Sequence, residues 1–566
     1  MSNERTGAQV IVDALIAEGV EYVFGLPGGH SVPVMYDEMA RREKPEAFPT
    51  RHETAGAFAA LGYAQVTGKV GVCQGTAGPG FGQMIPGMHE AWYSRIPMVA
   101  LAPNSPVPTY GMGALQEFPQ IETVIPFVKW WYRLDQAGKA GWAMRRAFTI
   151  AQAPPPGPVL LDIPLDVGSQ PAPAEEYRVV RSSKPAMDEE ALGEAARMLI
   201  EAELPVLICG RGVHQAGAYE ELRELAEALG APVLWTNHGK TCLPDDHPLN
   251  AGGTGVNRTP ASETMLDESD CWVWIGSQIE EFAVGKGWPE LPAGRRLINM
   301  NVDATQFGRN WPPDLAVCAD AKVALGQLVE AVRASGRDWD ERRSVLQARI
   351  AELRAEYRAV VGALVEESCG PVHPAQFLAA VQGALGPHDV VVLGEGATRV
   401  WTATELAIPT PGNWVSASDY GCMGYANAAA LGAAVGRPGA PIWCLTGDGS
   451  FQMQMQELAT AAQYALPIAF VVFNNQCLGW IKWGQERRCE GRHYAVDFSR
   501  NWRFAELAGA AGVEGVLVDS PDKCAAGVEL ARRGFAEERP VLIEVLTPWA
   551  EQTPGFLRHH GAGSPR

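Results

Sequence analysis

The sequence predicts an α/β protein with parallel β-sheets. Short runs of Val, Ile, Leu and Ala bounded by glycines alternate with helical patterns along the chain. This alternation is expected when crossover helices connect parallel strands. At 566 residues the chain is several times longer than a typical single-core domain, so we expect about three or four domains.

Two breaks in the apolar pattern divide the chain into three segments. The first break follows Val167, where GSQPAPAEEYRVVRSSKPAMDEE contains proline and charge but little apolar periodicity. The second contains a charge-patterned helical stretch, DERRSVLQARIAELRAEYRAV, followed by SCGPVHP. We therefore expect domains at residues 1–167, 187–340 and 370–550.

Composition excludes several functional classes. Hydrophobic residues at 47% and charged residues at 20% are typical of a soluble globular protein, and the formal charge of -19 argues against a nucleic-acid partner. The charged start MSNERTGAQVIVDAL lacks a signal-peptide core, and no run approaches the roughly 20 apolar residues that span a bilayer. Eleven cysteines without a C-x-x-C pair predict reduced thiols. We expect a cytoplasmic protein with no membrane partner.

The segment PIWCLTGDGSFQMQMQELATAAQYALPIAFVVFNNQCLGW predicts a ligand site at a sheet edge. Its pattern is strand, glycine turn, helix, strand and loop, which places Asp448 and Asn475 at the carboxyl ends of two parallel strands. Gly447 and Gly449 let the backbone approach a phosphate at the next helix. Carboxylate and amide oxygens suit Mg²⁺ beside a diphosphate. GDG alone would more often be a tight turn, but the combined unit favours the site.

GDG followed by NN at this separation resembles the thiamine diphosphate enzymes of the acetolactate synthase and pyruvate decarboxylase superfamily. The resemblance covers nearly the whole chain and implies three doubly wound parallel-sheet domains, namely pyrimidine-binding, middle and diphosphate-binding. It implies thiamine diphosphate and Mg²⁺ as cofactors. The implied metal ligands are Asp448, the Asn475 side chain and the Cys477 backbone carbonyl. The implied diphosphate contacts are Gly449, Ser450 and Gly479, to which the segment GEGATRVW adds Gly396, Ala397 and Thr398.

The cofactor needs a glutamate that shuttles a proton at the aminopyrimidine ring. RHETAGAFAALGYAQVTG resembles the family segment that supplies it, which assigns this role to Glu53. Burial in an apolar pocket would raise the pKa of such a carboxyl and favour proton sharing. Taken alone, a glutamate at a helix start is more often a favourable charge at the helix dipole. In this family GTAGPG, residues 75–80, also lies near the cofactor.

The segment GCMGYANAAALGAA supplies further implied contacts. By the resemblance, the Gly421 carbonyl contacts the aminopyrimidine and Met423 bends the cofactor, which makes proton transfer intramolecular. A core methionine is the alternative. Family architecture places Glu53 and Asp448 across a subunit interface, so we expect a homodimer at minimum and a homotetramer as the common form.

Two residues in the first segment are candidates for substrate binding. His30 in FGLPGGHS and Gln116 in MGALQEFPQ resemble the His and Gln of benzaldehyde lyase and related 2-hydroxyacyl lyases, which position substrate oxygens and relay protons. Acetolactate synthases also have a glutamine in a similar GAFQE context. An isolated loop histidine would otherwise be polar surface.

Departures from family motifs narrow the reaction. The paired histidines of pyruvate decarboxylases are absent from PTYGMGALQEF, and Gln74 replaces the histidine of benzoylformate decarboxylase, which disfavours a simple decarboxylase. Gly484 replaces the tryptophan of the acetolactate synthase loop, and GSQIEEFAVGKGW lacks the RFDDR arginine associated with FAD. The glycines of GRGVHQAG are too weak a motif to establish a nucleotide.

The leading hypothesis is a carboligase or lyase that makes or cleaves a carbon–carbon bond through an enamine-carbanion. Its small-molecule substrates would be 2-hydroxy ketones or 2-hydroxyacyl thioesters. The alternative is acetolactate synthase-like condensation of 2-oxo acids with decarboxylation. An FAD-linked oxidase and a non-catalytic homologue rank lower, and intact Glu53, Asp448 and Asn475 disfavour the latter. Whether CoA, ADP or FAD binds the middle domain stays open.

Overall fold

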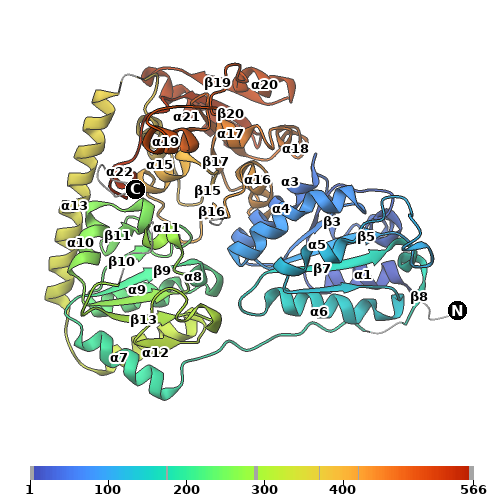
Figure 1. Ribbon diagram of the computed structural model, residues 1–566, viewed down its shortest axis with the longest axis horizontal. Coiled ribbons are helices and arrows are strands. Elements are labelled where there is room, and N and C mark those ends of the chain that lie inside the picture. The colour runs from blue at the N-terminus through green and yellow to red at the C-terminus, as the bar shows by residue number, and fades with distance from the viewer. Residues whose placement is uncertain (1–4, 174–175, 286–290, 369, 418–419, 560–566) are drawn as a thin grey trace.

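The computed structural model describes residues 5–173, 176–285, 291–368, 370–417 and 420–559. It contains three six-stranded sheets whose paired strands are all parallel, each flanked by helices (Figure 1). In each sheet the strand order reverses at an interior position, as in a doubly wound fold. The predicted α/β class is therefore confirmed.

The first sheet has the order β3-β2-β4-β5-β7-β6, and the order reverses between β2 and β4. Its strands are β2 (Tyr22–Gly25), β3 (Glu46–Phe48), β4 (Gly71–Gln74), β5 (Met98–Asn104), β6 (Trp130–Arg133) and β7 (Pro158–Pro164). Its helices are α1 (Gly7–Ala17), α2 (Asp37–Arg42), α3 (Glu53–Thr67), α4 (Pro79–Ser94), α5 (Gln120–Val124) and α6 (Ala140–Gln152). A separate antiparallel pair joins β1 (Arg5–Thr6) to β8 (Pro171–Ala172).

The second sheet has the order β11-β10-β9-β12-β13-β14. Its strands are β9 (Pro205–Cys209), β10 (Val233–Trp235), β11 (Asn250–Gly253), β12 (Cys271–Ile275), β13 (Arg296–Met300) and β14 (Leu315–Val317). Its helices are α7 (Glu189–Glu201), α8 (Arg211–Ala216), α9 (Tyr219–Leu229), α10 (Pro260–Glu268), α11 (Glu281–Val284) and α12 (Ala321–Ala334).

The third sheet has the order β16-β15-β17-β18-β20-β19. Its strands are β15 (Val390–Leu393), β16 (Trp414–Ser416), β17 (Ile442–Gly447), β18 (Ile468–Asn474), β19 (Glu514–Val518) and β20 (Val541–Leu546). Its helices are α14 (Pro374–Gln382), α15 (Ala397–Glu405), α16 (Tyr425–Gly436), α17 (Asp448–Phe451), α18 (Glu457–Gln463), α19 (Gly479–Arg488), α20 (Phe504–Ala510), α21 (Cys524–Ala536) and α22 (Pro554–His559). β17 and β18 pair in parallel as expected, but the crossover is divided into α17 and α18.

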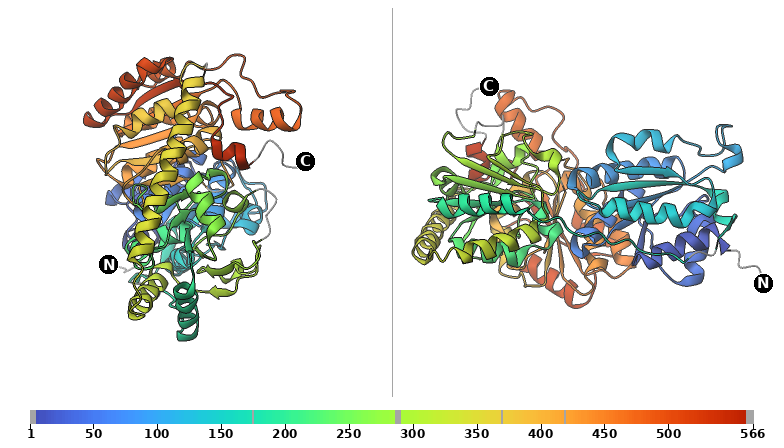
Figure 2. Two further views of the ribbon diagram at one scale, coloured as in Figure 1. Left: turned by 90° about the vertical axis from the view of Figure 1, so that its left-hand side faces the viewer. Right: turned by 90° about the horizontal axis from the view of Figure 1, so that it is seen from below.

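Two segments connect the three sheets. The described residues 176–188 contain no helix or strand and cross from the first sheet to the second (Figure 1). The long helix α13 (Asp340–Glu367) runs along the second and third sheets, at the far end from the first sheet in the right view of Figure 2. No helix in the described part of the chain is both long and apolar enough to cross a bilayer, and the cysteines there are free thiols.

Helices α3 and α16 pack closely and join the first sheet's layer to the third's. Ala and Gly make up most of the buried residues of both helices. A Cβ added at Gly62 would lie 2.1 Å from the Ala429 carbonyl oxygen, and one at Gly432 would lie 1.8 Å from the Ala59 carbonyl oxygen. Real atoms cannot approach so closely, so this contact requires glycine at both positions.

We expect Gly432→Ala to destabilise the protein by at least about 1–3 kcal/mol, the usual cost of overpacking a core. Urea unfolding measures this change. Gly193→Ala is the matched control, because Gly193 lies in helix α7 and a Cβ there meets nothing within 4 Å. An equal effect of the two substitutions would contradict the proposed role of the α3–α16 contact.

Candidate active site

A cavity of about 270 Å³ opens at the carboxyl edge of the third sheet, where the strand order reverses between β15 and β17. Every residue that the sequence suggested as a metal ligand or diphosphate contact lines it, as do the two suggested from the segment GCMGYANAAALGAA. They are Gly396, Ala397, Thr398, Gly421, Met423, Asp448, Gly449, Ser450, Asn475, Cys477 and Gly479. These residues come from four separate loops, so the tertiary fold brings them together.

Asp448 presents a buried carboxylate to this cavity. Oδ1 accepts a hydrogen bond from the Gly449 N–H at 2.9 Å, and Oδ2 accepts one from Asn501 Nδ2 at 2.8 Å. Burial nevertheless raises the pKa of Asp448 to about 7, because desolvation outweighs these donors. A bound cation would offset this cost.

Asn475 lies next to Asp448 on the adjoining strand end. Its Oδ1 accepts a hydrogen bond from the Cys477 N–H at 3.2 Å. A Cβ at Gly479 would lie 2.6 Å from Asn475 Nδ2, so a larger residue there would displace the Asn475 amide. Burial raises the pKa of the Cys477 thiol to about 12, which keeps the sulfur protonated.

The donor set suits a hard cation. One carboxylate, one amide oxygen and a backbone carbonyl are oxygen ligands, which Mg²⁺ prefers when water and phosphate oxygens complete its shell. Among the described residues, no group of three or more His, Cys, Asp and Glu side chains could hold a metal.

Glycines also shape the lining of the cavity. Gly396 (φ 102°) and Gly421 (φ 70°) adopt backbone angles that favour glycine. A Cβ at Gly449 would meet Met423 Cε at 3.4 Å, so the methionine side chain lies against the GDG turn. The Gly424 N–H donates to Ser450 Oγ at 2.8 Å and ties the two loops together.

Sequence reasoning missed several residues of this site. Phe282, from the second domain, stacks on Trp480 with ring centroids 6.0 Å apart, and both line the cavity. Glu395 also lines it and pairs with Arg399 at 2.7 Å. Asn501 lies in a loop without any motif, so no sequence signal indicated it.

The other candidates lie at the carboxyl edge of the first sheet. Glu53 is the first residue of α3 and is only partly buried within the chain. Its side chain lies against the turn 75–80, since a Cβ at Gly80 would be 3.1 Å from Glu53 Oε1. A Cβ at Gly78 would lie 2.6 Å from the Gln116 carbonyl oxygen, so Gln116 lies on the same turn.

His30 and Gln116 meet at this edge. Burial lowers the pKa of His30, although contacts with the Leu115 backbone and the Gln116 side chain oppose this shift. His30 is 8% exposed, and its Nδ1 has no hydrogen-bond partner among the described residues. The lowered pKa favours the neutral form of the imidazole, and Nδ1 is available to a ligand.

The predicted residues form two sets within one chain. The cavity at the third sheet is lined by residues 395–481 and by Phe282, and by none from the first domain. Glu53, His30 and Gln116 form the second set. None of these three residues lines the cavity at the third sheet.

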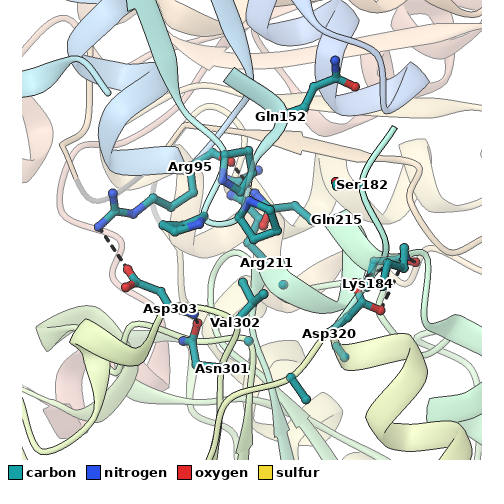
Figure 3. A pocket seen from close by; sticks show the side chains of 18 of the residues that line it. Arg95, Gln152, Ser182, Lys184, Arg211, Gln215, Asn301, Val302, Asp303 and Asp320 are labelled. Carbon is teal, nitrogen blue, oxygen red and sulfur yellow. Dashed lines mark hydrogen bonds and ion pairs between the residues drawn. The ribbon is translucent and has the colours of Figure 1, made fainter. Parts of the chain in front are cut away.

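A larger cavity of about 540 Å³ lies between the first and second domains and contains none of the predicted residues (Figure 3). Its charged side chains face one another, with Arg95 3.8 Å from Asp303 and Lys184 3.3 Å from Asp320. A Cβ at Gly212, in the glycine motif of the second domain, would lie 2.6 Å from Gly276 Cα. Gly212 and Gly276 therefore allow their two backbone segments to pack closely against each other.

Known protein families match part of each of the three domains. The matching descriptions are "Thiamine pyrophosphate enzyme, N-terminal TPP binding domain" (residues 5–123), "central domain" (192–328) and "C-terminal TPP binding domain" (394–545). Thiamine pyrophosphate is another name for thiamine diphosphate.

Individual relatives match over most of the chain. It is 31% identical to the probable acetolactate synthase large subunit of Methanocaldococcus jannaschii, over 97% of this chain and 93% of that protein. It is also 31% identical to the acetolactate synthase isozyme 1 large subunit of Escherichia coli K12 (90% and 88%) and to the acetolactate synthase of Mycobacterium bovis (96% and 88%).

Proposed function

Because the chain belongs to the thiamine pyrophosphate enzyme family, it is a thiamine diphosphate-dependent enzyme that forms carbon–carbon bonds, and we propose that its products are 2-hydroxy ketones. The observation behind this proposal is the pair His30 and Gln116 beside Glu53. A neutral imidazole with a free nitrogen and an amide can together bind one hydroxyl and one carbonyl oxygen. These are the two oxygens of a 2-hydroxy ketone.

The similarity to acetolactate synthases favours a 2-oxo acid as the donor substrate. A second candidate reaction is the reversible cleavage of 2-hydroxy ketones or 2-hydroxyacyl thioesters, which the His30–Gln116 pair would equally serve. Assays with 2-oxo acids plus aldehydes, with acyloins and with 2-hydroxyacyl-CoA esters distinguish these donors.

When bound, thiamine diphosphate supplies a carbon nucleophile that makes or breaks bonds next to a carbonyl. Asp448, Asn475 and the Cys477 carbonyl would hold Mg²⁺, and the glycine loops would hold the diphosphate. Glu53 would hold and return a proton at the pyrimidine ring nitrogen. His30 would donate to or accept from substrate oxygens.

We further propose that two copies of the chain complete each site, with Glu53 of one facing the cavity of the other. In support, large hydrophobic side chains near each of the two sets are exposed to solvent. Met112 and Leu115, near Gln116, are 77% and 79% exposed, while Ile481 and Tyr494, near the cavity, are 52% and 84% exposed. Contact between copies would bury this surface. A homotetramer is compatible with this unit, and free thiols suit the reducing cytoplasm.

Asp448→Ala should weaken retention of thiamine diphosphate by at least about tenfold, because the main anionic metal ligand is lost. Calorimetry with excess Mg²⁺ measures the affinity. Asp448→Asn keeps an oxygen ligand but loses the charge. Its affinity for thiamine diphosphate should lie between those of the wild type and Asp448→Ala. Unchanged affinity in Asp448→Ala would remove this residue from the metal site.

Glu53→Gln should slow exchange of the cofactor C2 proton by about 10²- to 10⁴-fold, because an amide keeps a hydrogen bond but cannot shuttle a proton. NMR of C2 deuterium exchange in the reconstituted enzyme measures this rate directly. A wild-type rate would mean that Glu53 is only a charge at the start of α3.

Co-expression of the Glu53→Gln and Asp448→Ala chains tests the shared site. Each mixed dimer would contain one intact site and one doubly altered site. Because random pairing makes about half of the dimers mixed, co-expression should restore about a quarter of wild-type turnover. Neither variant alone should be active. No recovery in mixed dimers isolated by two affinity tags would place both residues in the same chain's site.

His30→Ala should lower turnover while C2 exchange stays near normal, since Glu53 activates the cofactor. Gln116→Ala should affect the same step, so the double variant should lose less than the product of the single losses. Wild-type turnover of every substrate by His30→Ala would withdraw the proposed role of this pair.

A further inference from the structure

The loop that precedes Glu53 is held by the third domain of the same chain. The Glu457 carboxylate accepts hydrogen bonds from the Arg51 N–H at 3.0 Å (Oε1) and 3.3 Å (Oε2). Arg51 Nη2 donates to Gln463 Oε1 at 2.6 Å, and the Phe48 ring stacks on Tyr464 with centroids 4.3 Å apart. We call these contacts, made by α18 and the residue after it, the α18 clamp.

Glu457 is a buried ionisable group, which is costly for a purely structural contact. Its side chain is fully buried, and besides Arg51 it accepts one hydrogen bond from Thr460 Oγ1, at 2.7 Å. Desolvation raises the pKa of Glu457 to about 7, so an ionised carboxylate here costs free energy. Despite this cost, the Glu457 carboxylate holds the backbone N–H of Arg51, two residues before Glu53.

The residues that the clamp holds lead directly into Glu53, the proposed proton shuttle. Thr50 Oγ1 donates to the His52 carbonyl at 2.8 Å, and His52 Nδ1 accepts from the Thr54 N–H at 3.1 Å as the N-cap of α3. Glu53 therefore begins its helix directly after a loop whose backbone is fixed on one side by Glu457 and on the other by its own capping bonds.

We propose that Glu457 is a positioning residue for Glu53. This inference rests on the proposed role of Glu53 as the proton shuttle. Glu457 lies nine positions after Asp448 along the chain, beyond the short helix α17. If each site pairs Glu53 with the cavity of a second copy, the clamp joins the metal ligand of one site to the base of the other.

Glu457→Ala in the reconstituted holoenzyme tests the proposal. A shift of the base by about 1 Å can cost about 10²-fold, so C2 exchange should slow by roughly 10- to 100-fold while cofactor affinity stays near wild type. Deuterium uptake of the apoprotein, measured by mass spectrometry, should rise in the peptide covering residues 49–56. This second measurement needs no cofactor.

Two further variants keep the test specific. Glu457→Gln retains an oxygen acceptor for the Arg51 N–H, so exchange should stay within about threefold of wild type. Asp389→Ala is the matched control: Asp389 is a buried carboxylate with a raised pKa in the same domain, at the opposite sheet edge, bound to Trp443 Nε1 at 2.9 Å. It should leave both C2 exchange and uptake over residues 49–56 unchanged.

Three results would overturn the proposal. They are wild-type exchange in Glu457→Ala, an equal loss in Glu457→Gln, which would indicate a proton-carrying role, and an equal loss in Asp389→Ala, which would indicate general destabilisation. Normal exchange in Glu53→Gln would instead refute the assignment of the base itself. The two failures are therefore distinguishable.

Discussion

The contact between α3 and α16 fixes the geometry on which the rest of the site depends. Gly62 and Gly432 allow the two backbones to touch, so the helices cannot slide without a steric clash. α3 begins at Glu53, and α16 begins directly after the loop that contains Gly421 and Met423. One close helix pair therefore sets where the first and third sheets present their carboxyl edges.

Two buried carboxylates near these edges show how the fold uses charge. Burial raises the pKa of both Asp448 and Glu457 to about 7. Because each folded pKa lies above the ordinary value near 4, each group costs the protein stability as pH rises from that value through about 7. Glu457 is partly compensated by fixed donors from Arg51 and Thr460, whereas Asp448 also faces a cavity where a cation would remove the cost.

The second domain touches the candidate site mainly through an aromatic side chain. Phe282 lines the cavity and stacks on Trp480. The Arg399 guanidinium lies over the Phe282 ring, 5.4 Å from its centroid. The lining of the cavity therefore includes a contact between the second and third domains.

The sequence alone determined the fold class and placed Asp448 and Asn475 at one edge of a sheet. Alternating apolar runs and helices specify parallel sheets, and GDG and NN follow strands whose carboxyl ends must meet at one edge. Asp448 and Asn475 could be placed together because this constraint is local to one strand–helix–strand unit. The domain boundaries, the metal and the roles of the site residues remain predictions.

Only the tertiary structure decided the contacts that depend on distant segments. Asn501, Phe282 and Glu457 lie in stretches without a motif, and each gains its role from a neighbour in another loop or domain. The separation of Glu53 from the cavity in a single chain likewise follows from how the sheets pack. Periodicity and glycine turns specify local elements, whereas packing of side chains far apart in sequence determines which of those elements meet.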